Sequence, residues 1–194
     1  MKKGKIRFRQ LDFELDGFGD ELVDWSIGKR GCGPTSVAIV LANYGHDVTP
    51  VDISRMVLTD ENGKFTNRFI SVGGISNDGI FYTPGKLGVR YEIVKIDFDN
   101  PVSQRKKIID NLRSGNMAII QVGPEVGDAN FQGTFSKRGH YLVVSDVDED
   151  ENLYVINPNA IGDDQIGVPF GYDDIVREMY GRRHKMNFLF VERK

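Results

Sequence analysis

The segment from residue 31 to residue 45 constrains this chain more than any other. It contains the only cysteine, Cys32, between two glycines, and Pro34 follows at a position that suits the first turn of a helix. A run of Val, Ala, Ile, Val, Leu and Ala comes next, and Gly45 stands where a left-handed C-terminal cap is expected. A helix that is apolar on every face lies buried at the centre of a fold. The sequence therefore predicts a buried central helix with a thiol at its N-terminus.

This position of the thiol allows two interpretations. A helix N-terminus stabilises negative charge and lowers a thiol pKa from its free value of about 8.5, which favours Cys32 as a nucleophile. The N–H of Gly33 would then be free to point at a developing oxyanion. However, free cysteine is also among the most buried residue types, so Cys32 could equally be a small core residue. This segment alone does not separate the two.

Length, charge and hydropathy exclude several classes of protein. At 194 residues we expect one domain, residues 1–194, with residues 1–9 as an arm. The net charge of −3 and the lack of a long Lys/Arg run argue against a nucleic-acid partner. No stretch approaches the roughly 20 apolar residues of a membrane span, and no apolar run follows the basic N-terminus. We therefore expect a cytoplasmic protein with no membrane partner, unless a signal peptide has been removed. The sequence points to no particular oligomeric state.

Helical patterns come first along the chain and strand patterns come later. Helices are expected at 32–44, 49–58, 77–87, 103–113 and 171–180, and strands at 89–96, 117–122, 139–147, 153–158 and 187–191. Residues 5–16 suggest a short strand or extended arm, and loops are expected at 17–30, 59–80 and 123–138. This order predicts an α+β fold with an antiparallel sheet. The two later loops are expected to line a cleft.

Cysteine catalysis needs a base within hydrogen-bond reach and a third group that orients this base. His140 opens an apolar strand, and Asn157 closes the next strand, so a hairpin would bring them together. Asn157 could instead only begin a turn before Pro158, and a lone histidine at a strand edge is usually a surface residue. Together with Cys32, the pattern favours a catalytic set. His46 lies about 20 Å from Cys32 by the helical rise, and His184 lies in a basic turn, so neither suits the base.

Three segments resemble the Cys, His and Asn/Asp boxes of papain-like cysteine peptidases. They are Gly31-Cys32-Gly33-Pro34-Thr35-Ser36, Gly139-His140-Tyr141-Leu142-Val143-Val144 and Tyr154-Val155-Ile156-Asn157-Pro158. Their order is similar to that of the bacteriocin-processing (double-glycine) cysteine peptidases and their stand-alone relatives, over most of residues 10–191. The resemblance implies a papain-like α+β fold, with the helix that carries the cysteine packed against an antiparallel sheet that carries His and Asn.

The resemblance also implies roles for individual residues. Cys32 would be the nucleophile, His140 the general base and then acid, and Asn157 the orienting residue. The oxyanion glutamine of the family often stands six residues before the cysteine, where this chain has Ser26, so Gln10 is the candidate for this role. The expected activity is hydrolysis of a peptide or protein substrate without a metal or organic cofactor. An amidase, isopeptidase or transferase with the same site, or an inactive binding domain, are the alternatives.

Two charged segments are weaker candidates for a functional site. Residues 146–152 are acidic, but they lack the glycine and the distal glutamate of a calcium loop, so a hairpin turn is the better interpretation. A basic cluster near the C-terminus is expected to be a solvated face; it consists of Arg177, Arg182, Arg183 and Lys185.

Overall fold

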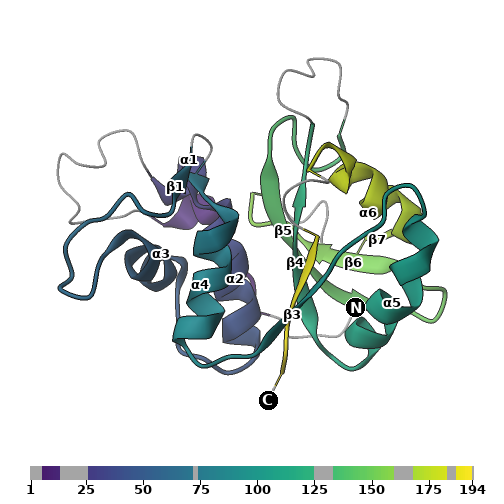
Figure 1. The fold of residues 1–194 in the computed structure, drawn as a ribbon, viewed down its shortest axis with the longest axis horizontal. Coiled ribbons are helices and arrows are strands. Elements are labelled where there is room, and N and C mark those ends of the chain that lie inside the picture. The colour runs from purple at the N-terminus through teal and green to yellow at the C-terminus, as the bar shows by residue number, and fades with distance from the viewer. Residues whose placement is uncertain are drawn as a thin grey trace.

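The protein folds around a six-stranded antiparallel sheet with helices against both of its faces (Figure 1). This is seen in a computed structural model that describes residues 6–13, 26–71, 74–124, 133–159, 168–182 and 187–193. The N-terminal part is mainly helical and lies on one side of the sheet, whereas the C-terminal part supplies the strands (Figure 1). The α+β class, with a cysteine-bearing helix against an antiparallel sheet, is therefore confirmed.

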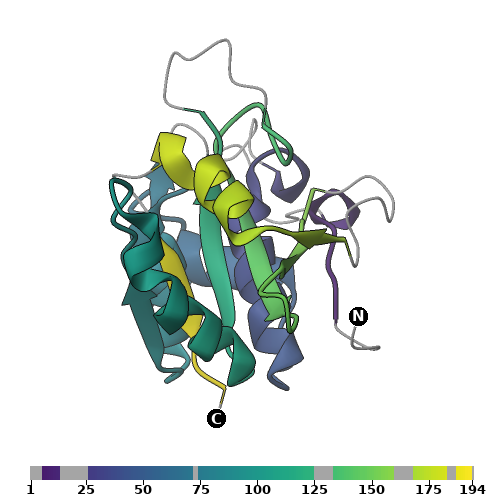
Figure 2. The same cartoon turned by 90° about the vertical axis from the view of Figure 1, so that its right-hand side faces the viewer.

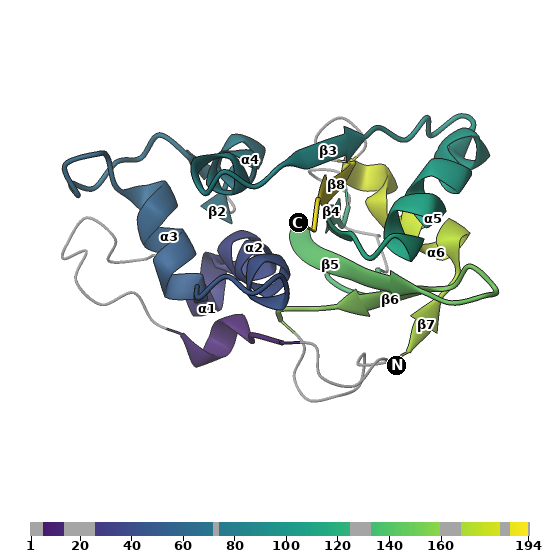
Figure 3. The same cartoon turned by 90° about the horizontal axis from the view of Figure 1, so that it is seen from below.

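The N-terminal part contains four α-helices among its described residues. Its elements are the 3-10 turn η1 (Gln10–Asp12), α1 (Ile27–Arg30), α2 (Cys32–Asn43), α3 (Pro50–Leu58), the small hairpin of β1 (Ile70–Ser71) and β2 (Gly74–Ile75), and α4 (Asn77–Lys86). Helix α2 lies between α3 and the sheet, and η1 lies beside α1 (Figure 3). The predicted helix at 49–58 is confirmed, because Thr49 and Asp52 form a reciprocal capping box and Pro50 opens the first turn.

The C-terminal part contains the six-stranded sheet, whose strands run in the order β3-β8-β4-β5-β6-β7. The strands are β3 (Tyr91–Val94), β4 (Met117–Val122), β5 (His140–Val147), β6 (Leu153–Ile156), β7 (Pro169–Phe170) and β8 (Phe188–Val191). The helical elements here are η3 (Pro101–Gln104), α5 (Arg105–Arg113), α6 (Tyr172–Met179) and η4 (Tyr180–Arg182). Helices α5 and α6 cover the face of the sheet opposite to α2 (Figure 2).

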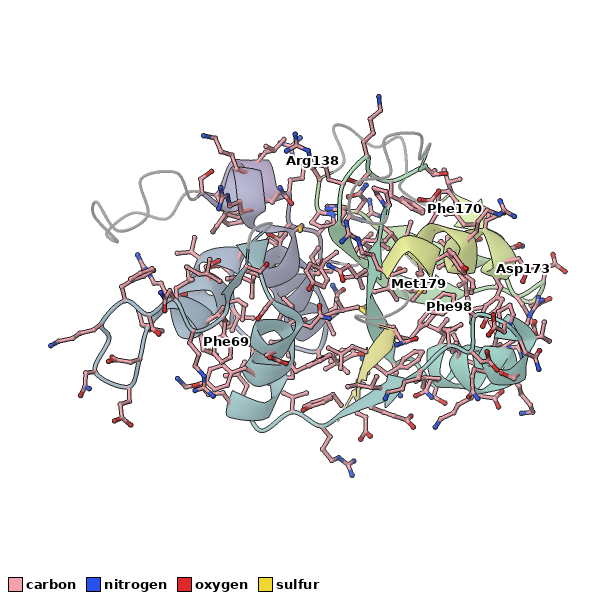
Figure 4. All side chains as sticks on the ribbon, turned by 45° about the horizontal axis from the view of Figure 1, so that its top comes forward. Phe69, Phe98, Arg138, Phe170, Asp173 and Met179 are labelled. Carbon is pink, nitrogen blue, oxygen red and sulfur yellow. The ribbon has the colours of Figure 1, made fainter. Side chains whose placement is uncertain are left out.

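Side chains of the central strands are buried on both faces of the sheet, in strict alternation. On β4, Ile119 belongs to the core shared with α2, whereas Ala118 and Ile120 belong to the core shared with α5 and α6. Phe69 lies among the first set of helices, and Met179 lies on the other side of the sheet (Figure 4). Burial on both faces explains why these strands read as nearly continuous apolar runs rather than as an apolar and polar alternation.

The expected elements are otherwise reproduced, with four differences. Of the expected short strand or extended arm at 5–16, residues 6–9 form an arm and no strand, and Gln10–Asp12 form the turn η1. The main chain of Ile6 exchanges two hydrogen bonds with the Asn43 side-chain amide, at 2.9 and 2.8 Å. A short helix, α1, occupies the end of the expected loop at 17–30, because the Ser26 hydroxyl accepts a hydrogen bond from Lys29 N. The β1–β2 hairpin and β7 were not expected.

The acidic segment at 146–152 contains the last two residues of β5 and the turn at 148–152 that leads to β6. Asp148 closes this turn, because its carboxylate accepts hydrogen bonds from the main chain and the side chain of Asn152, at 2.8 and 3.1 Å. Within the described ranges, no group of three or more His, Cys, Asp or Glu side chains is placed to hold a metal ion. In the same ranges, no helix is both long enough and apolar enough to span a bilayer.

Candidate active site

Cys32 is the first residue of α2, directly after the short helix α1. A β-carbon at the preceding residue, Gly31, would lie 2.5 Å from the main-chain oxygen of Ile27, so only glycine allows α1 and α2 to meet this closely. Helix α2 is buried along nearly its whole length, whereas the Cys32 side chain stays partly exposed. The thiol is therefore fixed by a core helix and still reachable from solvent.

The structure brings three of the predicted residues together. Cys32 lies close enough to the imidazole of His140, the first residue of β5, for the two groups to shift each other's pKa. On the other side of the ring, His140 Nε2 lies 2.8 Å from Oδ1 of Asn157, which directly follows β6. His140 is only 4% exposed, so this imidazole depends on the two partners for its polar contacts.

A second hydrogen bond to Asn157 fixes the proton on the imidazole. Asn157 Oδ1 also accepts from the main-chain N–H of Asn159 at 2.9 Å, and only an oxygen can accept there. His140 Nε2 must therefore be the donor to Oδ1, which leaves Nδ1 as the ring nitrogen that faces the thiol. A neutral imidazole in this tautomer offers Cys32 a lone pair and can take its proton.

A β-bulge in the hairpin sets the register of this contact. Between β5 and β6 the pairing shifts at Val144 and Asp146, and Val143 then pairs with Ile156. The same register places Asn157 opposite Leu142, two residues from His140, a diagonal separation that side chains of this length can bridge. Without the bulge, Asn157 would lie one residue further from His140. The irregularity is thus part of how the site is assembled.

Electrostatics favour the ionised form of the thiol and the protonated form of the imidazole. Burial by itself would raise the pKa of the Cys32 thiol, but the hydrogen bond and charge of His140 and the main-chain N–H groups of Tyr141 and Gly33 lower it below its usual value. For His140, burial acts to lower the pKa, while Cys32 and Asn157 raise it, and the net direction is upward. Both shifts are in the direction that favours a thiolate–imidazolium pair.

The proposed oxyanion residue, Gln10, lies between the chain segments that carry Cys32 and Asn157. Its side chain is 4% exposed, and its Nε2 donates to the carbonyl oxygen of Gly28 at 2.8 Å. Its main-chain N–H donates to Pro158 O at 2.8 Å. Because a primary amide has two N–H groups, one of them is left over after the bond to Gly28. Ser26, by contrast, uses its hydroxyl as the cap of α1.

His46 and His184 do not belong to this set, and Arg182 lies in an unexpected position. His46 follows the C-terminal end of α2, remote from Cys32, and His184 lies outside the described residues. Of the two loops expected to line a cleft, the described hairpin in the first lies close to the cysteine segment, because a β-carbon at Gly74 would lie 2.6 Å from Arg30 O. Arg182 was expected on a solvated face, but its guanidinium lies against Gly139, next to His140.

Sequence reasoning missed Tyr141, whose main-chain N–H points at the Cys32 sulfur. Its hydroxyl donates to Oδ1 of Asn77 at the start of α4 and so connects the sheet to the helical side. Burial raises the pKa of this phenol. The only signal in the sequence was its position beside His140, since an aromatic residue in an apolar strand otherwise indicates packing.

The chain is similar to known proteins in sequence and in fold. A protein of Methanothermobacter thermautotrophicus described as uncharacterized is 23% identical over 175 residues, 90% of this chain and 91% of that protein. An uncharacterized protein of Methanothermobacter marburgensis is 25% identical over 183 residues, 94% of this chain and 96% of that protein. The crystal structure of a C39-like peptidase from Bacillus anthracis shares the fold, with a TM-score of 0.61 and 15% identity over 98% of this chain and 96% of that chain. Since the model of the Peptidase_C39 like family matches residues 6–177, the chain belongs to that family.

Proposed function

We propose that this protein is a cysteine peptidase, a thiol hydrolase that cleaves a peptide or amide bond through an acyl-enzyme on Cys32. One observation carries the proposal, namely that His140 lies beside Cys32, closely enough to lower the pKa of the thiol, while its Nε2 lies 2.8 Å from Asn157 Oδ1. This arrangement suits a nucleophile, a base and an orienting group. Membership of the Peptidase_C39 like family supports the same reaction class.

The reaction would proceed in two steps. The Cys32 thiolate attacks the carbonyl carbon, and the protonated His140 donates its proton to the leaving amine as the C–N bond breaks. A water molecule then attacks the thioester, His140 takes its proton, and the Cys32 thiolate is released with the carboxylic acid product. The main-chain N–H of Cys32 and the free N–H of the Gln10 amide would stabilise the oxyanion of both steps. No metal or organic cofactor takes part in these steps.

The first experiment measures the alkylation of Cys32 by iodoacetamide at pH 7. A free thiol is only about 3% ionised there, so a fully ionised pair gains up to about 30-fold in thiolate, reduced by its lower intrinsic nucleophilicity. We expect the wild-type protein to react faster than free cysteine and the His140→Ala variant to react more slowly than both. Reaction no faster than that of free cysteine, and unchanged in His140→Ala, would refute the catalytic role.

The second experiment identifies the acceptor of the acyl group. A panel of peptides that includes Gly-Gly sequences is incubated in water enriched in oxygen-18, and the products are analysed by mass spectrometry. A peptidase incorporates the heavy oxygen at the new C-terminus, and Cys32→Ala does not. A transferase instead gives products joined to an added amine without the label, and an inactive binding domain gives no product at all.

A further inference from the structure

Arg182 occupies a place at the candidate active site that its sequence context does not explain. It ends η4, the turn after α6, and its guanidinium fills the space where a side chain at residue 139 would begin. A β-carbon at Gly139 would lie 2.7 Å from Arg182 Nη2 and 2.8 Å from its Cζ. Because Gly139 directly precedes His140, the charge lies next to the chain segment that carries the imidazole.

The guanidinium also lies close to the strand that carries the imidazole. Gly139 leads directly into β5, whose first two residues are His140 and Tyr141. Tyr141 packs in the core that contains α2, the helix that begins with Cys32. The charge of Arg182 acts on the Tyr141 phenol, whose pKa is raised by burial and by Cys32 and is lowered in part by Arg182. Arg182 therefore lies beside the segment that carries His140 rather than on the outer surface of α6.

This cation has no anionic partner in the described part of the chain. Its Nε is buried without a hydrogen-bond acceptor. Glu178, one helical turn earlier, uses Oε1 to accept from Thr134 N at 2.7 Å, and its Oε2 is buried without a hydrogen-bond partner. Arg177, in contrast, pairs with Asp174 at 3.0 Å on the outer surface.

A polar acceptor lies on the neighbouring strand β4. Gln121 pairs with Tyr141 across β4 and β5, and its Oε1 is also buried without a partner. Buried donors and acceptors are almost always satisfied in a folded protein. An open donor next to Gly139 and an open acceptor on the residue paired with Tyr141, the two neighbours of His140 in the chain, point to a ligand that completes them.

The chemistry of the proposed reaction defines which ligand this is. The leaving amine must lie beside His140, which protonates it, so the residue before His140 borders the leaving-group side. A guanidinium binds carboxylates with two parallel hydrogen bonds. We propose that Arg182 binds a carboxylate in the first or second residue after the cleaved bond, with Gln121 as a further polar contact. The carboxylate is either the free C-terminus of a short leaving group or an Asp or Glu side chain. This inference rests on the proposed function for its orientation.

The test uses binding, so that it does not depend on cleavage. Three dipeptides that mimic the leaving group, Ala-Ala, Ala-Ala-amide and Ala-Asp-amide, are titrated into the Cys32→Ala protein and followed by NMR. We expect Ala-Ala or Ala-Asp-amide to bind at least tenfold more tightly than Ala-Ala-amide. The tighter of the two carboxylates distinguishes a C-terminal from a side-chain source. Arg182→Gln should remove the difference, Arg182→Lys should keep part of it, and Arg177→Gln is the matched control that should keep it all.

Equal binding of all three dipeptides, or no binding of any, would overturn the inference. So would a preference for carboxylates that survives in Arg182→Gln, provided that its NMR spectrum shows the native fold. The alkylation of Cys32 is a separate measurement, so a failure of the proposed function would be seen there and not in these titrations. If Cys32 proves reactive and peptides are cleaved with no preference for a carboxylate, only the role of Arg182 is wrong.

Discussion

Asn157 offers the most direct test of the geometry, because its oxygen connects His140 to the main chain. In Asn157→Ala the imidazole loses its acceptor at 2.8 Å, and nothing then holds the Nε2 proton and the ring plane. During catalysis the ring is charged, and a hydrogen bond to a charged group contributes about 1.5–3 kcal/mol. At about 1.4 kcal/mol for each factor of ten, kcat/KM should fall about 10- to 150-fold.

The matched variant is Asn157→Asp. A carboxylate keeps both acceptor positions, for His140 Nε2 and for Asn159 N, and adds a negative charge. The pKa of His140 should then rise further, and the alkaline limb of the pH–rate profile should move to higher pH. The assay is kcat/KM for a cleaved peptide between pH 5 and 10, with circular dichroism as the check on folding. A fall of less than threefold in Asn157→Ala, with no shift in Asn157→Asp, would refute the orienting role.

Three further predictions concern ionisation, the oxyanion and stability. The pKa of Cys32 is lowered and that of His140 is raised. We therefore expect the ion pair in a pH window that begins at the Cys32 pKa, below that of free cysteine, and ends at the His140 pKa, above that of free histidine. Alkylation followed against pH should show this window, and His140→Ala should show a single rise on the alkaline side. If the Gln10 amide binds the oxyanion, Gln10→Ala should lower kcat by about 10²–10³-fold. The rate of iodoacetamide alkylation should stay unchanged, since that reaction has no oxyanion. An unchanged kcat would exclude this role. Tyr44→Phe removes the hydroxyl that donates to Val191 O at 2.8 Å and accepts from Met117 N at 2.6 Å. The free energy of unfolding, measured in denaturant, should then fall by about 1–3 kcal/mol. No loss would mean that water replaces both bonds.

The fold was predictable wherever local signals and periodicity agreed. Helix α3 is an example, since Thr49-Pro50 and Asp52 are an N-terminal signal that needs no tertiary context. The short elements were not predictable in this way. Strands β1, β2 and β7 have two residues each, too few for any alternation to show. Helix α1 has only four residues and a single buried apolar one, Ile27, so its cap at Ser26 was the only available signal.

The contact between His140 and Asn157 was predictable from the sequence, whereas the other contacts of the candidate site were not. A hairpin from 140 to 157 was enough to bring His140 and Asn157 together. However, the bulge that sets their register lies in a strand that is buried on both faces, where no break in alternation marks it. Packing between distant elements brings the Tyr141 N–H close to the Cys32 sulfur and places the Arg182 guanidinium against Gly139. Such contacts have no local pattern in the sequence.

The division between rigid and variable parts of the site follows from where its residues are attached. Cys32 begins a core helix and His140 begins a core strand, and α2 and β5 pack against each other in one hydrophobic core. Their mutual position is therefore set by that core rather than by loops, which is what a reacting pair with sub-ångström tolerance requires. Arg182 lies at the end of η4, outside this shared core, and the β1–β2 hairpin reaches the cysteine segment from another side. Substrate preference can therefore change at these peripheral segments while the thiol and imidazole stay in place.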